Sequence, residues 1–236
     1  MPRRRWRPTR TAAVLTKPPP HPQIEVAGEV LTLLPQRAVY WARQRMLLVA
    51  DAHFGKAARF RMHGVPIPRG TTDDNLDVLD TLLDNHAIDR IVFLGDLMHG
   101  RIARDAPTFE RLGSWCAQRR GVALELIMGN HDRHAGALPS ALSITVHSEP
   151  YRIGPFALCH HPATLDDAYV LAGHLHPVIR LYGRGLGRVQ APCFVFGPRA
   201  AVLPAFGAFT GGFRIARQPA DRIWVVAGEQ VLRLPG

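Results

Sequence analysis

Five short apolar runs in this chain are each followed at once by Asp, Asn or His, and this restricts the fold more than any other feature. The runs are 46–50, 91–94, 124–128, 156–159 and 169–172. The polar residues that follow them include Asp51 and His53, Asp96 and His99, Asn130 to Asp132, His160 and His161, and His174 and His176. A packed core does not explain five strand ends of this kind. The pattern predicts a site at one edge of a sheet, where the strands end.

The first half of the chain predicts alternating strands and helices. A hairpin is expected at 29–34 and 37–41, and strands are expected at 46–50, 90–94 and 123–128. Three helices are expected: one at 54–62, one that is capped by Thr71 or Thr72, and one that is capped by Asp105. This order predicts a parallel sheet with right-handed crossovers. Asp77, Asp80 and Asp84 fall opposite the apolar positions of the second helix, which indicates a solvated face and not a metal cluster.

The second half consists of short predicted strands separated by Gly and Pro. They are expected at 143–147, 151–153, 156–159, 170–173, 178–182, 188–195, 200–203 and 222–232. We therefore expect an α/β protein with two sheets packed face to face, helices outside and the site on one rim. No internal repeat or later linker divides 23–236, so we expect one domain there.

Composition excludes several classes of protein. The 236 residues are 47% apolar, which suffices for a large core, and no run of ~18 apolar residues predicts a membrane span. No secretory leader is expected at the basic start. Cys116, Cys159 and Cys193 are odd in number and too far apart for a zinc clip, which indicates a reduced, cytoplasmic protein. Cys159 is expected to be a small buried residue, with a thiolate role as the alternative.

The net charge of +10 is unevenly placed. Residues 1–22 contain five arginines, one lysine and no acid, which leaves +4 for the rest. This Pro-rich segment is predicted to be a disordered tail. It can bind phosphate backbones non-specifically, or it is a solubilising tail or the product of a misassigned start.

The residue types at the strand ends suit two divalent metal ions. Ions about 3.5–4 Å apart can hold a phosphate and an attacking hydroxide. Carboxylates, imidazoles and one amide favour Mn, Fe, Zn or Co over Ca or Mg. Residues i and i+2 share a side of an extended chain, so Asp51 and His53 are expected to point the same way, as are His174 and His176. The expected ligands are Asp51, His53, Asp96 as the bridge, Asn130, His160, His174 and His176.

Neighbouring residues are candidates for the chemistry and for substrate binding. His131 can act as a general acid, with Asp132 orienting its imidazole. Lys56, Arg59 and Arg61 can neutralise a phosphate or line a nucleic-acid groove. His99 either faces the site or caps a turn, and His161 can exchange roles with His160. Four other histidines are expected on the surface or in the core: His63, His86, His134 and His147.

The ordered series from Asp51 to His176 resembles the calcineurin-like metallophosphoesterase superfamily. The resemblance implies a four-layer α/β/β/α sandwich, the metallo-dependent phosphatase fold. It implies that one metal is held by Asp51, His53, Asp96 and His176, and the other by Asp96, Asn130, His160 and His174. It assigns His131 to the leaving group, with Asp132 as its partner.

Segments 51–61, 64–72, 192–194 and 203–212 resemble the bacterial ligase-associated DNA-damage-response endonuclease family (PdeM-type). This resemblance implies a manganese-dependent phosphodiesterase acting on DNA in repair, beside an ATP-dependent DNA ligase, a helicase and an exonuclease. Two alternatives stay open. One is a phosphatase or small-nucleotide pyrophosphatase on the same metal centre, because ligands alone do not define the substrate. The other is a non-catalytic scaffold for repair proteins.

Overall fold

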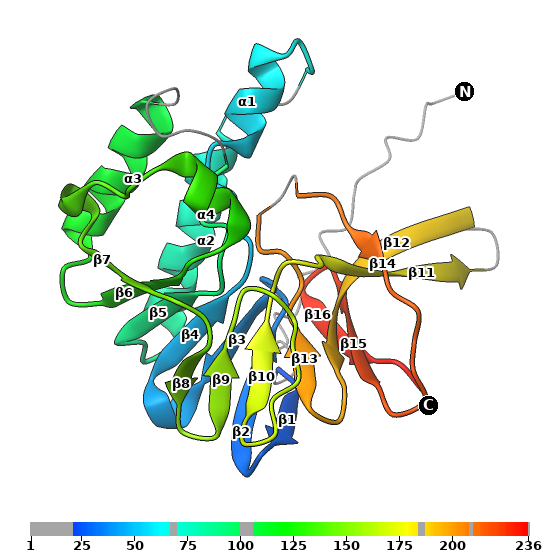
Figure 1. The fold of residues 1–236 in the computed structure, drawn as a ribbon. Coiled ribbons are helices and arrows are strands. Elements are labelled where there is room, and N and C mark those ends of the chain that lie inside the picture. Colours follow the sequence, from blue (N-terminus) through cyan, green and yellow to red (C-terminus); the bar gives the residue numbers. More distant parts are fainter. Residues whose placement is uncertain (1–20, 67–69, 100–105, 184–186, 208–209, 236) are drawn as a thin grey trace, which may run out of the picture.

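The computed structural model describes residues 21–66, 70–99, 106–183, 187–207 and 210–235. Two mixed β-sheets pack face to face, and helices lie against the first of them (Figure 1). The predicted tail lies outside the described residues except for His21 and Pro22. So do Asp105, which was expected to cap a helix, and residues 67–69 of the expected loop.

The first sheet has seven strands in chain order. Its antiparallel half contains β1 (Gln23–Val26), β2 (Glu29–Leu34), β3 (Ala38–Trp41) and β4 (Met46–Val49). Its parallel half continues from β4 with β5 (Arg90–Phe93), β6 (Ala123–Ile127) and β7 (Ile144–His147). The predicted parallel unit is confirmed, and the carboxyl ends of these strands meet at one edge. Two short 3-10 turns, η1 (Ala42–Gln44) and η3 (Ser140–Leu142), were not predicted.

Within the described residues, four helices accompany the first sheet: α1 (Lys56–Met62), α2 (Thr71–Asn85), α3 (Ala106–Gln118) and α4 (Asn130–Ala135). α2 and α3 cover its outer face, where Leu79 and Trp115 pack onto strand residues such as Val49. The predicted threonine cap of α2 is wrong, because Thr71 is the first helical residue and Gly70, at φ 95°, precedes it without a side-chain cap.

The aspartates of α2 form no metal cluster among the described residues. Asp77 and Asp84 are exposed, as expected. Asp80 instead joins the two helices, because its Oδ1 accepts hydrogen bonds from Trp115 Nε1 at 2.7 Å and from Arg119 Nε at 2.9 Å.

The second sheet has nine strands in the part of the chain that the structure describes. They are β8 (Tyr151–Ile153), β9 (Phe156–Leu158), β10 (Tyr169–Ala172), β11 (Pro177–Gly183), β12 (Gly187–Phe196), β13 (Ala200–Val202), β14 (Phe213–Arg214), β15 (Arg222–Ala227) and β16 (Gln230–Arg233). The long strand β12 pairs with β11 up to Pro192 and with β15 from Cys193 onward. The single strand predicted at 222–232 is wrong: Gly228, at φ 60°, turns the chain, and β15 and β16 form an antiparallel hairpin.

The main core lies between the sheets, where residues such as Leu48 and Val92 meet Phe194 and Phe196. Alternate residues of β4 face opposite ways: Leu48 contributes to this core, whereas Leu47 packs under the helices. That double burial explains the unbroken apolar runs. The predicted sandwich of two mixed sheets with flanking helices is confirmed.

The outer face of the second sheet has no helix among the described residues, and side chains of loop 162–168, such as Leu165, cover part of it. None of the described helices combines the length and the apolar character that a membrane crossing needs.

Candidate metal centre

The carboxyl ends of five strands deliver the predicted ligands to one rim. Asp51 and His53 follow β4, Asp96 follows β5, and Asn130 begins α4 directly after β6. His160 follows β9, and His174 and His176 follow β10. The structure thus brings together all seven side chains that were expected to bind metal. Most of them are buried, with Asp51 and His160 fully so.

The backbone is left-handed at five of these seven positions. The φ angles are 52° at Asp51, 47° at His53, 49° at Asp96, 68° at His174 and 47° at His176. The paired side chains do converge, but the backbone that carries them is not extended. The predicted reason for their convergence, that residues i and i+2 share a side of an extended chain, is therefore wrong. Asp and His tolerate positive φ better than most residues. Such conformations carry strain and cluster at functional sites.

The first donor cluster contains Asp51, His53 and His176. The Nε2 atoms of the two histidines lie 3.3 Å apart, and His176 Nε2 lies 3.4 Å from Asp51 Oδ1. His176 Nδ1 donates to the carbonyl of Thr210 at 3.3 Å, so in the neutral imidazole Nε2 carries a lone pair. Asp51 Oδ1 is buried and has no hydrogen-bond partner. A cation between these atoms would satisfy all three.

The second donor cluster contains Asn130, His160 and His174. His160 Nδ1 donates to the carbonyl of Leu94 at 3.0 Å, which leaves Nε2 with a lone pair in the neutral ring. That atom lies 2.9 Å from Asn130 Oδ1 and 3.0 Å from His174 Nδ1. Lone pairs that face each other in a buried space are stabilised by a cation.

Asp96 lies between the two clusters. Its Oδ2 is 3.8 Å from His53 Nε2, and its Oδ1 is 3.4 Å from His160 Nε2. One carboxylate therefore faces both clusters, which is the position of a bridging ligand. Burial lowers the pKa of His53 and of His174, and neighbouring Lys56 and His160, respectively, add to the effect. Neutral imidazole is the form that binds metal, so the donor set fits a pair of divalent ions.

His131 and His99 lie beside the first cluster. His131 Nε2 is 3.9 Å from Asp96 Oδ2, and its side chain is 42% exposed. The His99 ring lies 5.3 Å from the His53 ring and 4.9 Å from the His131 ring, so His99 faces the site. Burial, with Lys56 next, lowers the pKa of His99 to about 4.

Asp132 does not make the contact expected of it. Its two carboxylate oxygens accept hydrogen bonds from the backbone N–H groups of Gly129, at 3.0 Å, and Met98, at 3.2 Å. Within the described parts of the chain, no hydrogen bond joins it to His131. Asp132 instead ties the start of α4 to the loop after β5. This places His131, whose backbone N–H donates to Asp96 Oδ1 at 2.9 Å.

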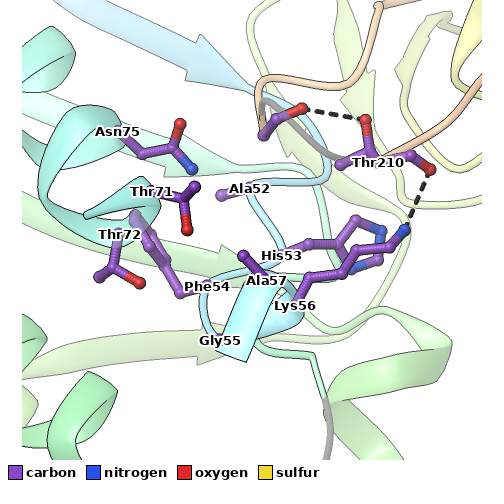
Figure 2. Close-up of a pocket in the computed structure, with 11 residues that line it drawn as sticks. Ala52, His53, Phe54, Gly55, Lys56, Ala57, Thr71, Thr72, Asn75 and Thr210 are labelled. Atoms are coloured by element: carbon purple, nitrogen blue, oxygen red, sulfur yellow. Dashed lines mark hydrogen bonds between the residues drawn. The ribbon is translucent and has the colours of Figure 1, made fainter. Parts of the chain in front are cut away.

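Lys56 reaches the centre from α1. Its Nζ donates to the carbonyl of Thr210 at 3.0 Å, the same oxygen that His176 contacts. Figure 2 shows Lys56, His53 and Thr210 on one side of a small pocket, with Thr71 and Asn75 on the other. Burial lowers the pKa of Lys56, and the carboxylates of Asp51 and Asp96 oppose that shift.

The other basic residues of α1 lie in its last turn. Arg59 is exposed, and its charge adds to the lowering of the His99 pKa. Arg61 is half-buried. Both arginines lie on α1, the helix that also carries Lys56.

Of these two neighbouring histidines, His160 has the geometry expected of the predicted ligand. His160 is fully buried with Nε2 against Asn130, whereas the His161 side chain is 41% exposed and its Nδ1 lies 2.7 Å from Glu149 Oε1. Sequence reasoning missed Glu149 and Thr210. Glu149 belongs to no motif, and Thr210 lies in the segment 203–212 that carries the family resemblance, which did not assign it a contact with Lys56 or His176.

The four other histidines that were assigned to the surface or the core lie elsewhere, as expected. His63 and His134 are exposed. His86 packs against Tyr40, and His147 pairs with Glu125 in the first sheet.

Two glycines allow the chain segments of the centre to approach closely. A Cβ atom at Gly129 would lie 2.4 Å from Asp96 Oδ1, and one at Gly173 would lie 2.6 Å from Asp51 Oδ2. Neither glycine has a positive φ, so the requirement at both positions is for space. The glycines that precede Asn130 and His174 are therefore part of the centre.

Comparison with known proteins agrees with this geometry. The family profile described as calcineurin-like phosphoesterase matches residues 44–161. Among solved structures, the nuclease MPE of Pseudomonas putida superposes with a TM-score of 0.81 at 41% sequence identity. The match covers 91% of this chain and 100% of that one. None of the curated proteins compared with the chain matches it.

Proposed function

Because this chain belongs to the calcineurin-like phosphoesterase family, which is a family of metal-dependent hydrolases with a dinuclear site, we propose that it hydrolyses phosphodiester bonds in DNA. The observation that carries the proposal is the carboxylate of Asp96, which lies 3.8 Å from one donor cluster and 3.4 Å from the other. The nuclease at 41% identity supports the choice of a nucleic-acid substrate.

The proposed ligands divide between the two clusters. Asp51, His53, Asp96 and His176 would hold one ion, and Asp96, Asn130, His160 and His174 the other. The donor chemistry and the family resemblance favour Mn²⁺, with Fe, Zn or Co as alternatives. When bound, two such ions would supply Lewis-acid stabilisation of the phosphate charge and activation of a water.

The chain's own residues would orient the substrate and move the proton. His131 is accessible to a substrate beside Asp96, and its imidazole would donate a hydrogen bond or a proton to the departing oxygen. Asp132 would act as a positioning residue through the backbone of Gly129 and Met98. Lys56, Arg59, Arg61 and His99 would face the DNA phosphates on the α1 side.

The cellular setting is part of the proposal and rests on the resemblance to the ligase-associated endonucleases. We place the enzyme in DNA repair beside an ATP-dependent ligase, a helicase and an exonuclease. The three free cysteines are buried, which suits a reducing cytoplasm. We treat 23–236 as one catalytic domain and 1–22 as a separate basic tail.

The test is a turnover panel with Mn²⁺ on bis-p-nitrophenyl phosphate, p-nitrophenyl phosphate and labelled single-stranded DNA. We expect cleavage of the diester and the DNA well above that of the monoester. Asp96→Ala should lose activity and bound metal. His131→Ala should lose about 10²–10⁴-fold in turnover and keep both ions. His86→Ala, a histidine change outside the site, is the matched control.

Each other outcome points to a different function. Diester cleavage without DNA cleavage would favour a small nucleotide substrate, and dominant monoester cleavage would favour a phosphatase. A chain that turns over none of the three substrates would favour the scaffold. Wild-type turnover in Asp96→Ala would contradict the assignment of the site.

A further inference from the structure

The carboxylate of Glu149 is the main hydrogen-bond acceptor for the loop that carries His160 and His161. Its Oε2 accepts from the backbone N–H of His160 at 2.8 Å and from that of His161 at 2.9 Å. Its Oε1 lies 2.7 Å from His161 Nδ1. One side chain, 20% exposed, therefore determines the position of two consecutive histidines at the rim.

Together with two other hydrogen bonds, the contact with Glu149 holds His160 in place. Its backbone N–H is held by Glu149, its carbonyl accepts from the N–H of Gly173 at 3.1 Å, and its ring Nδ1 donates to Leu94. Only Nε2 is left, and it faces Asn130 and His174 in the second donor cluster. Loss of the Glu149 contact would therefore release one of the three groups that set where this nitrogen lies.

Glu149 also determines which ring nitrogen of His161 is available to another ligand. With Nδ1 engaged by the carboxylate, Nε2 is the ring nitrogen that remains for another ligand. The His161 ring lies 4.5 Å from the His174 ring, and one nitrogen each of His160, His161 and His174 lie within 4.8 Å of one another. A carboxylate that binds one nitrogen of an imidazole, while the other binds a metal, is a recurrent arrangement.

We propose that Glu149 is the positioning residue of the second donor cluster: it holds His160 in place and presents His161 as an additional nitrogen donor to the metal bound there. The inference rests on the proposed two-metal function. It assigns to Glu149 no contact with substrate, and it adds His161 to the three side chains already placed in this cluster.

The electrostatics of Glu149 agree with this role. Burial alone raises its pKa, but the hydrogen bonds from His161 and His160 outweigh burial and hold the pKa below its ordinary value. The side chain therefore stays an anion that accepts three hydrogen bonds. Glutamine is similar in shape, but it offers one oxygen and an NH₂ group to a site that supplies three donors.

The chain contains a matched control in Glu125. Its Oε2 lies 2.8 Å from His147 Nε2 and its Oε1 is 3.0 Å from Arg90 Nε, whereas Glu149 pairs with His161 and lies 4.0 Å from Arg133 Nη2. Glu125 lies within β6, in the first sheet, away from both donor clusters. Glu125→Gln thus removes a similar Glu–His contact without touching the centre.

The experiment is a calorimetric titration of the metal-free full-length protein with Mn²⁺, together with electron paramagnetic resonance of the loaded protein. Thermal unfolding verifies that each variant is folded. In Glu149→Gln we expect one of the two Mn²⁺ ions to bind roughly 10–100-fold more weakly, with loss of the signal of the coupled pair. His161→Ala should weaken the same ion by a smaller factor. Glu125→Gln should bind both ions as the wild type does.

Three outcomes would overturn the inference. If folded Glu149→Gln and Glu149→Ala both bind two Mn²⁺ ions with wild-type affinity, Glu149 does not position the cluster. Equal weakening in Glu125→Gln would assign the effect to general stability. If His161→Ala leaves both affinities unchanged, His161 is no donor. A wild-type chain that binds fewer than two ions would instead overturn the proposed function itself.

Discussion

Replacing Gly129 by alanine tests whether the two donor clusters depend on close packing around Asp96. The new Cβ atom would lie 2.4 Å from Asp96 Oδ1 and 2.5 Å from the Asp96 backbone nitrogen. Gly129 has φ −87°, which alanine adopts without strain, so only the clash is tested. Asp96 cannot swing aside freely, because its Oδ1 accepts the hydrogen bond from His131 N–H.

The size of the effect follows from these distances. A contact of 2.4 Å must open by at least about 0.6 Å to reach the 3.0 Å below which Cβ atoms are essentially never found. A misplacement of about 1 Å at a reacting centre can cost roughly 10²-fold in rate. Overpacking destabilises a fold by about 1–3 kcal/mol, so most molecules should stay folded. We expect turnover of bis-p-nitrophenyl phosphate with Mn²⁺ to fall roughly 100-fold per folded molecule.

Gly121→Ala is the control for this change, because nothing lies within 4 Å of the Cβ atom that it adds. Initial rates, bound manganese and thermal unfolding should be measured on both variants. Gly121→Ala should match the wild type in rate and metal content. A folded Gly129→Ala protein with turnover within threefold of the wild type would refute the reasoning, since it would show that Asp96 can move without loss of function.

The remaining predictions concern metal, thiols and the core. Removal of metal with EDTA should lower the melting temperature, and Mn²⁺ at 100 times its Kd should restore about 2.7 kcal/mol per site; an unchanged melting temperature would contradict the metal centre. Burial raises the pKa of Cys116 and Cys159 to about 11 and of Cys193 to about 12, so a thiol reagent at pH 8 should label none of them before unfolding. Because unfolded thiols with a pKa of 9.0 release protons first, these groups should lower the free energy of unfolding as pH rises above 9. Phe156→Ala should cost about 3–5 kcal/mol in urea denaturation, and a loss below about 1 kcal/mol would contradict its place in the core.

Much of the fold was predictable because a strand that is buried on both faces of its sheet appears in the sequence as an unbroken apolar run. The run that forms β4 is apolar throughout, since Leu47 packs under the helices and Leu48 between the sheets. Turns were harder to predict. Gly70 begins a helix and Gly228 reverses a hairpin, both with positive φ, and a glycine within a run does not reveal which conformation it takes.

The candidate site was predictable in composition but not in geometry. The metal-binding residue types follow strands whose ends meet at one edge of a sheet, so their convergence follows from topology. The left-handed backbone at Asp51 and His53 was not foreseen, because periodicity describes regular strands only. Glu149 and Thr210 contact the site from other segments, and such contacts depend on the completed fold.

The left-handed backbone of the centre limits how its metal preference can be redesigned. At Asp51, Asp96 and His174, any replacement ligand must adopt φ between 49° and 68° before it can coordinate. For most residues this conformation costs about 1–2 kcal/mol; only glycine adopts it routinely, and asparagine, aspartate and histidine tolerate it better than the rest. A glutamate in place of Asp51, or a cysteine in place of His174, would therefore meet a conformational penalty apart from any change in metal affinity. Ligand exchange is easier to engineer at His160, which is absent from the positive-φ positions.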